Sequence, residues 1–343
     1  MRVHFLNSRI ILAALGVAFT SVGFAADKIP VTVDNFPRAE TDTTIATYAK
    51  EGGFGKFLHA RTPQSIDNQK VVRMNRDTLY SFGIFDLDAG PVTVTLPDAG
   101  KRYMMSQVLD EDQFTHEIVY APGTKTYSRD QIGTRYVIIN IRTLVDPNSA
   151  DDLKQVHALQ DAIKVEQASQ GELILPNWDK TSQDKVRNAL KVLGSTLQNS
   201  DRMFGSRSDV DPVHYLIGSA IGWGGNPRSA AIYVTAQPKD ESGEKIETIT
   251  VKDVPVDGFW SVSVYNAKGY FEKNALNAYS LNNLTAKTND DGGITVQFGG
   301  CKKDTPNCLP TTKNWNYTVR LYRPRAELLN GDWKFPETVL VSK

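Results

Sequence analysis

Short stretches of alternating apolar and polar residues recur toward both ends of the chain. They cover residues 91–96, 102–109 and 135–141 in the N-terminal third, and 231–236, 247–252, 259–265, 294–298 and 317–322 in the C-terminal part. Alternation with a period of two predicts strands, and the Gly, Pro, Asn and Asp residues between the stretches predict turns. Many short strands at such spacing are typical of antiparallel sandwiches and jelly rolls, not of a doubly wound parallel sheet.

The middle of the chain has a helical pattern instead. Asn148 can cap a helix that runs from Ala150 to about Gln167, and Thr181 or Ser182 can cap a second helix. The apolar residues of this second helix recur at helical spacing and are Val186, Ala189, Leu190, Leu193 and Leu197. The fold class predicted is therefore mainly β with a helical bridge and two antiparallel jelly-roll or sandwich-like units. The predicted parts are an N-terminal β domain at 26–142, the bridge at 143–211 and a C-terminal β domain at 212–343.

The first 25 residues differ from the rest of the chain. Arg2 and Arg9 precede an apolar run over residues 10–19, and Gly23 to Ala25 end the segment with small residues where a signal peptidase reads them. This pattern predicts a signal peptide at 1–25 and a periplasmic or secreted protein. The apolar run is too short to cross a bilayer, and no later segment approaches the roughly 20 residues needed, so we expect no membrane span in the mature chain.

The net charge of the chain bears on whether it binds nucleic acid. The 343 residues carry 39 Lys and Arg against 39 Asp and Glu. A chain this close to neutral does not attract a polyanion strongly, so no nucleic-acid partner is expected.

Cys301 and Cys308 are the two cysteines of the chain, and they lie in one turn-rich stretch between strand-like runs. In an oxidising compartment such a pair predicts a disulfide. The alternative is a metal site, which would need two further ligands, and no His or other Cys lies nearby in the sequence.

The densest polar group of residues in the chain is Asp110, Glu111 and Asp112 followed by His116. On an extended segment Asp110, Asp112 and His116 would share one face and could act as a catalytic acid/base group or hold a hard metal ion. The alternative is a solvated turn between two strands with His116 on its rim. The sequence motifs of serine hydrolases, zinc proteases, P-loop proteins, dinucleotide-binding folds and EF-hands are absent.

A second polar group occupies residues 73–81 and supplies the candidate ligand-binding residues Arg73, Asn75, Arg76, Asp77 and Tyr80. Guanidinium groups among apolar residues either pair with protein carboxylates or bind an anionic ligand, and the sequence leaves both alternatives open. Trp260 is a further candidate, because its ring can stack on a sugar or an aromatic ligand, although such residues are more often part of a β core.

The motif that includes these residues also carries a family resemblance. Residues 72–81, 86–92 and 102–103 resemble the family of domains of unknown function numbered 1254. The C-terminal part resembles its usual companion, numbered 1214, at residues 257–265, 291–293, 314–315, 320–324, 331–333 and 336. The resemblance implies two antiparallel β units of jelly-roll type joined by helices, often in exported bacterial proteins, and it implies no reaction. Arg323 before Pro324 and the insertion from Cys301 to Cys308 depart from the common pattern.

These observations predict a protein that binds, and in one version hydrolyses, an unknown small organic or carbohydrate ligand in a cleft of the β domains. Asp110 or Asp112 with His116 would supply acid/base chemistry, and Arg73 or Arg76 would hold an anionic group. The sequence leaves open whether the protein is an enzyme, and no cofactor or bound metal is predicted. The alternative is a non-catalytic envelope or assembly protein that could form homo-oligomers.

Overall fold

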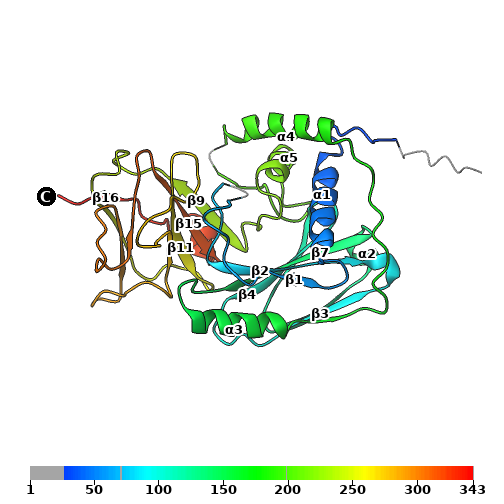
Figure 1. The fold of residues 1–343 in the computed structure, drawn as a ribbon, viewed down its shortest axis with the longest axis horizontal. Helices are drawn as coiled ribbons and strands as arrows, with labels where there is room; N and C mark the ends of the chain where they lie inside the picture. Colours follow the sequence, from blue (N-terminus) through cyan, green and yellow to red (C-terminus); the bar gives the residue numbers. More distant parts are fainter. Residues whose placement is uncertain (1–26, 70–71, 198, 343) are drawn as a thin grey trace, which may run out of the picture.

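The computed structural model describes residues 27–69, 72–197 and 199–342, so the predicted signal peptide at 1–25 lies outside the described residues. The chain forms a larger N-terminal part with two sheets and most of the helices, and a smaller C-terminal β sandwich beside it (Figure 1). In the described residues, no helix has both the length and the apolar character required to span a bilayer.

The N-terminal part is built on a five-stranded antiparallel sheet in the order β1-β2-β7-β4-β5. Its strands are β1 (Phe57–His59), β2 (Thr78–Asp86), β7 (Tyr136–Leu144), β4 (Met104–Leu109) and β5 (Thr115–Tyr120). A three-stranded sheet in the order β6-β3-β8 packs beside it, with β6 (Gly123–Tyr127), β3 (Val92–Leu96) and β8 (Lys164–Glu166). Apolar residues of both sheets, including Val94, Val108 and Ile139, form one core.

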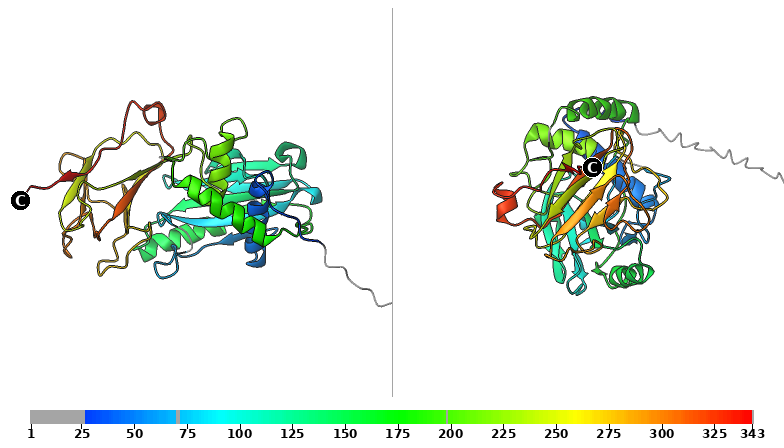
Figure 2. Two further views of the ribbon diagram at one scale, coloured as in Figure 1. Left: turned by 90° about the horizontal axis from the view of Figure 1, so that it is seen from above. Right: turned by 90° about the vertical axis from the view of Figure 1, so that its left-hand side faces the viewer.

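Helices cover both sides of the N-terminal part (Figures 1 and 2). On one side lie α1 (Phe36–Lys50), α4 (Lys180–Gly194) and α5 (Pro212–Ile221), which contact one another and share a core. On the other side lies α3 (Ala150–Asp161), whose buried Val156 packs on Leu79 of β2. Three further helices are short: α2 (Arg129–Ile132), α6 (Ala326–Leu329) and the 3-10 turn η1 (Leu87–Ala89).

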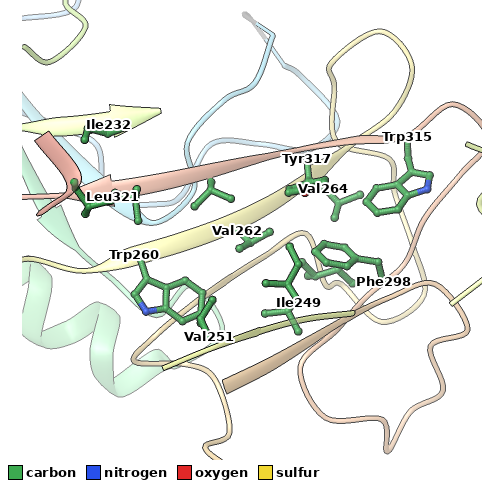
Figure 3. Packing of buried hydrophobic residues seen from close by; sticks show 14 residues of the cluster. Ile232, Ile249, Val251, Trp260, Val262, Val264, Phe298, Trp315, Tyr317 and Leu321 are labelled. Carbon is green, nitrogen blue, oxygen red and sulfur yellow. The ribbon is translucent and has the colours of Figure 1, made fainter. Parts of the chain in front are cut away.

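The C-terminal part is a sandwich of two four-stranded sheets. One has the order β12-β11-β15-β9, with β12 (Ser280–Asn282), β11 (Trp260–Tyr265), β15 (Asn316–Tyr322) and β9 (Ala231–Ala236). The other has the order β14-β13-β10-β16, with β14 (Cys308–Leu309), β13 (Ile294–Phe298), β10 (Glu247–Val251) and β16 (Val339–Leu340). Figure 3 shows Val262, Phe298 and Trp315 in the apolar core between the two sheets.

The predicted fold class is confirmed: strands dominate, the sheets are antiparallel apart from the β13–β14 pair, and helices join the β units. The predicted disulfide is present between Cys301 and Cys308, with 5.6 Å between their Cα atoms. Each strand-like stretch of the sequence contains a strand.

The helix predictions need three corrections. The N-caps are Ser149 and Asp179, each of which accepts a hydrogen bond from a backbone N–H of the first helical turn. The first helix ends at Asp161 because residues 164–166 leave it to pair with β3. Helices α1 and α5 were not predicted, and the structure has them where the N-terminal third and the residues after 211 were expected to form strands.

Candidate functional site

Asp110 and His116 meet at the hairpin between β4 and β5. The Oδ1 atom of buried Asp110 accepts hydrogen bonds from the backbone N–H groups of Asp112 and Phe114, both at 2.9 Å. Its Oδ2 atom lies 2.9 Å from Nε2 of His116, which is exposed on the rim of the hairpin. The carboxylate therefore holds the turn closed and orients the imidazole, as the acid/base hypothesis requires of this pair.

Asp112 is turned away from His116. One oxygen of its carboxylate accepts a hydrogen bond from Nε of Arg38 on α1 at 2.9 Å, and the other lies 3.9 Å from Arg207. The three-residue metal site that the sequence allowed is therefore not assembled. Within the described ranges, no group of three or more His, Cys, Asp or Glu side chains is placed to hold a metal ion.

A different polar region lies where the two parts of the molecule meet. In the β11–β15 pair, Ser261 is opposite Arg320 and Ser263 is opposite Thr318, and all four residues are buried. The alternate residues of these strands point into the sandwich core, so the sheet is buried on both faces. Alternation normally leaves the polar face in water. Here the polar face is covered by the N-terminal part.

Arg320 fixes the segment that leads into β2 onto this face. Its Nη1 atom donates to Oγ of Ser263 at 2.8 Å. Its Nη2 atom donates to the hydroxyl of Tyr265 at 2.6 Å and to the backbone carbonyls of Arg73 and Met74 at 2.8 and 3.3 Å. One buried guanidinium thus joins β11, β15 and residues 73–74.

Asp77 supplies the negative charge near Arg320. It is 1% exposed, and its Oδ2 atom accepts a hydrogen bond of 2.6 Å from Oγ of Ser261. Burial raises the pKa of the Asp77 carboxyl, while the Arg320 charge and the serine hydrogen bond oppose the rise. The predicted candidate Asp77 therefore joins the two parts of the chain through groups that lie 184 residues apart in sequence.

Asn75 lies beside Asp77 and contacts two tyrosines. Its Nδ2 atom lies 3.1 Å from Oγ1 of Thr78, 3.3 Å from the hydroxyl of Tyr80 and 3.1 Å from the hydroxyl of Tyr322. Since an amide nitrogen only donates, both tyrosine hydroxyls act as acceptors toward it. The Asn75 amide therefore contacts both Tyr80 of β2 and Tyr322 of β15, which belong to different parts of the molecule.

Arg142 of β7 lies directly opposite Tyr80 of β2 in the sheet and is 6% exposed. Its Nη1 atom donates to Oδ1 of Asn226 at 2.6 Å and to Oε1 of Gln107 at 3.0 Å, and its Nη2 atom donates to the carbonyl of Gly224 at 2.8 Å. Its guanidinium carbon lies 5.4 Å from the centre of the Tyr80 ring, within the range of a cation–π contact.

Four tyrosines interact electrostatically with Arg142, and they come from both parts of the molecule: Tyr80, Tyr103, Tyr233 and Tyr322. Burial raises the pKa of Tyr103, Tyr233 and Tyr322. Burial would also raise the pKa of Tyr80, but the Arg142 guanidinium and the hydrogen bond from Asn75 bring it below the usual value. We call this group the junction cluster; it consists of Asn75, Tyr80, Tyr103, Arg142, Asn226, Tyr233 and Tyr322.

The remaining predicted ligand residues lie outside the junction cluster. Arg73 is exposed, and its Nη2 atom lies 3.4 Å from Oδ1 of Asn316. Arg76 donates to the carbonyl of Gln64, and its guanidinium carbon lies 5.6 Å from the centre of the Tyr279 ring. Trp260 is 4% exposed and packs in the sandwich core (Figure 3). The structure therefore brings together Asn75, Asp77 and Tyr80 but not Arg73, Arg76 or Trp260.

The sequence did not predict a role for Arg142, for Arg320 or for the tyrosines of the C-terminal sheet. A signal for the arginines was present, because each is the single charged residue of a strand that is otherwise apolar or neutral, Tyr136–Leu144 and Asn316–Tyr322. A charge in such a strand is costly to bury without a polar partner.

Two parts of the chain match known protein families. Sequence models of two families, both described as proteins of unknown function, match the chain: DUF1254 at residues 54–167 and DUF1214 at residues 230–326. Among curated proteins, none matches the chain.

Two solved structures are similar to the chain. The VPA0106 protein from Vibrio parahaemolyticus is 17% identical, with a TM-score of 0.67 over 91% of this chain and 100% of that one. An uncharacterized protein from Burkholderia cenocepacia is 14% identical, with a TM-score of 0.51 over 90% of this chain and 88% of that one. Likeness at these identities establishes the fold and nothing about chemistry.

Proposed function

The chain combines a DUF1254 domain with a DUF1214 domain, and we propose that it binds a small polar organic molecule, such as a carbohydrate or a hydroxylated organic acid, in the junction cluster. The proposal places the ligand between the two β-rich parts. Aromatic rings with hydroxyl groups, side-chain amides and a guanidinium are the groups that orient such ligands in proteins.

One observation carries the proposal. The hydroxyl of Tyr103 is buried and has no hydrogen-bond partner among the described residues, although it lies within the electrostatic reach of Arg142. A buried polar atom without a partner costs free energy, and nearly all such atoms in folded proteins are satisfied by protein, water or ligand. A bound polar molecule would supply the missing acceptor.

Partial exposure of the cluster supports access for a ligand. Asn75, Tyr80 and Tyr233 are half-buried, whereas Arg142, opposite Tyr80 in the sheet, is almost fully enclosed. Tyr80 belongs to a central strand whose backbone is paired on both sides, so its exposed surface belongs mainly to its side chain. We propose that a small molecule enters past Tyr80 and Tyr233.

Binding without hydrolysis is the simpler form of the proposal. The Asp110–His116 pair belongs to the β4–β5 hairpin, and its hydrogen bonds do not reach the junction cluster directly. A chain of hydrogen bonds does run from Arg142 through Gln107 to Thr115, the residue before His116. This chain of hydrogen bonds connects the two regions.

A thermal-shift screen of the purified protein against sugars, hydroxy acids and amides tests the proposal. A ligand at 100 times its dissociation constant adds about 2.7 kcal/mol of stability, which gives a readily measured rise in Tm. The double variant Tyr80→Phe/Tyr233→Phe should lose the shift, while the control Tyr127→Phe, which removes a hydroxyl in β6, should keep it. A shift that survives in the double variant would place the ligand elsewhere.

The location of the protein belongs to the same proposal. The disulfide between Cys301 and Cys308 and the export segment predicted at 1–25 support a periplasmic or secreted protein. N-terminal sequencing of the protein isolated from its producing cell tests this, with cleavage after Ala25 as the expected result. An intact N-terminus on a cytoplasmic protein would contradict it.

A further inference from the structure

We propose that the ligand of the junction cluster carries a carboxylate group, for which Arg142 is the counter-ion. This inference rests on the proposed function, because it specifies the chemistry of the molecule bound at the same site. It follows from two observations on the described residues. The buried charge of Arg142 has no carboxylate partner, and tyrosine hydroxyls near it lack acceptors for their protons.

The imbalance of charge concerns two buried arginines. Arg320 is 3% exposed and has the buried carboxylate of Asp77 nearby as its opposite charge. Arg142 is 6% exposed, and across the described ranges no carboxylate lies within 4 Å of it; its hydrogen-bond partners are amide and backbone oxygens and a methionine sulfur. A buried guanidinium is normally paired, because removing a charge from water is costly.

Three less deeply buried arginines of the same protein follow the normal rule. Arg102 pairs with Asp152, Arg135 pairs with Asp86, and Arg187 pairs with Glu40. Arg142 is more enclosed than these three arginines and still has no such partner among the described residues. Its single uncompensated charge matches one carboxylate.

The tyrosine hydroxyls add an imbalance of donors. Tyr80 and Tyr322 accept from the amide of Asn75, and Tyr233 accepts from the amide of Asn226 at 2.9 Å. A phenolic oxygen that accepts still has its own proton to donate. The Tyr80 hydroxyl also has a side-chain hydrogen bond with Thr78, whereas the hydrogen bonds of Tyr233 and Tyr322 are ones in which their hydroxyls accept. The hydroxyl of Tyr103 has no partner among the described residues, and Tyr103, Tyr233 and Tyr322 all interact electrostatically with Arg142, so these donors lie near a guanidinium that lacks an anionic partner.

This arrangement selects a carboxylate rather than a neutral polar group. The two oxygens of a carboxylate accept about four hydrogen bonds and carry one negative charge, which satisfies Arg142 and the hydroxyls together. The aromatic rings around them suit a ligand whose remainder is apolar or aromatic. The chemical class that we infer is therefore a small organic carboxylate with an apolar body.

The test compares each acid with its neutral amide. Benzoate and benzamide, and phenylacetate and phenylacetamide, are titrated into the wild-type protein by isothermal titration calorimetry at constant ionic strength. The carboxylates should bind more tightly than their amides, by roughly 10- to 100-fold, the range of a hydrogen bond made to a charged partner. In Arg142→Gln this preference should fall to within about threefold.

The possible results separate the inference from the proposed function. If amides and carboxylates bind equally, and the Tyr80→Phe/Tyr233→Phe variant weakens both, the site is real and the carboxylate inference is wrong. If no member of either pair binds, and the wider screen of polar compounds gives no shift sensitive to these tyrosines, both are wrong. Should Arg142→Gln fail to fold, Tyr233→Phe replaces it and should weaken benzoate more than benzamide, since it removes one donor to the anion.

Discussion

The Nη1 atom of Arg142, in the five-stranded sheet, lies 2.6 Å from Oδ1 of Asn226, in the loop that leads into the C-terminal sandwich. The amide of Asn226 in turn donates to the hydroxyl of Tyr233 on β9. The contact between the two β-rich parts is therefore specified by polar groups of defined geometry as well as by apolar packing. Such contacts restrict the relative placement of the two parts.

Replacing Arg142 with Lys should destabilise the protein even though the charge is kept. An ammonium group cannot reach Gln107, Asn226 and the Gly224 carbonyl together, so at least one buried acceptor loses its donor. We expect the free energy of unfolding to fall by about 2 kcal/mol in urea titrations. The exposed pair Arg228–Asp201 gives a control, since Arg228→Lys should change stability by less than about 0.5 kcal/mol. An unchanged midpoint for Arg142→Lys would mean that these bonds contribute nothing.

Asp77→Asn should be more damaging than Ser261→Ala. The first removes the buried negative charge near Arg320, while the second removes only the hydrogen bond that joins the two residues. Leaving a buried charge without its partner costs about 3 kcal/mol, and losing one neutral donor costs about 1 kcal/mol. Equilibrium unfolding of both variants measures the difference. The reverse order would show that Asp77 is protonated and does not serve as the counter-charge of Arg320.

A pH dependence is expected from Asp42 on α1. This carboxyl is 1% exposed, one oxygen accepts from the Trp178 indole at 2.7 Å, and the other has no partner among the described residues. Burial raises its pKa from 3.8 to about 6, despite the opposing hydrogen bond from Trp178, and the negative charge of Glu111 adds to the rise. The folded state thus holds its proton more tightly than the unfolded state does.

The raised pKa of Asp42 in the folded state sets the direction in which stability changes with pH. Stability contributed by Asp42 is present below pH 3.8, falls as the pH rises toward 6, and is absent above it. The total loss is on the order of 3 kcal/mol. Asp42→Asn should flatten this slope between pH 4 and 7, whereas the exposed control Asp34→Asn should leave it unchanged. Parallel wild-type and Asp42→Asn curves would contradict a raised pKa.

The disulfide should stabilise its loop without deciding the fold. Cross-linking Cys301 and Cys308 closes a short loop, for which chain entropy gives about 2.5 kcal/mol. The double variant Cys301→Ser/Cys308→Ser should lose about that amount and still fold, because Cys308 belongs to β14, an edge strand of its sheet. Urea unfolding with and without reductant measures it, since wild type with reductant should match the variant. Loss of folding in the variant would show that the loop organises the whole sandwich.

The fold was predictable where local pattern and final environment agree. The strands at 231–236 and 294–298 lie where their alternation places them. Helix α1 was not predictable, because it has no clear apolar stripe and contains four threonines, which are poor helix formers. In the structure these threonines bond to the carbonyls four residues earlier, and the helix is held by packing against α4 and α5.

Two of the seven residues of the junction cluster were candidates from the sequence, and the other five were not. Asn75 and Tyr80 belong to one compact motif, whereas Tyr233 and Tyr322 come from strands that meet it only in the folded chain. The polar residues of β11 and β15 were indistinguishable from an ordinary solvated face, because alternation records which residues share a face and not what covers it.

The position of a bound carboxylate tests the assignment of Arg142 as its counter-ion. Crystals of the protein soaked in 4-bromobenzoate would give an anomalous signal from the bromine and difference density for the carboxylate. We expect the carboxylate within hydrogen-bonding distance of Arg142 and of at least one of Tyr80, Tyr103, Tyr233 and Tyr322. Bromobenzoate bound elsewhere, with the junction cluster empty at saturating concentration, would contradict it.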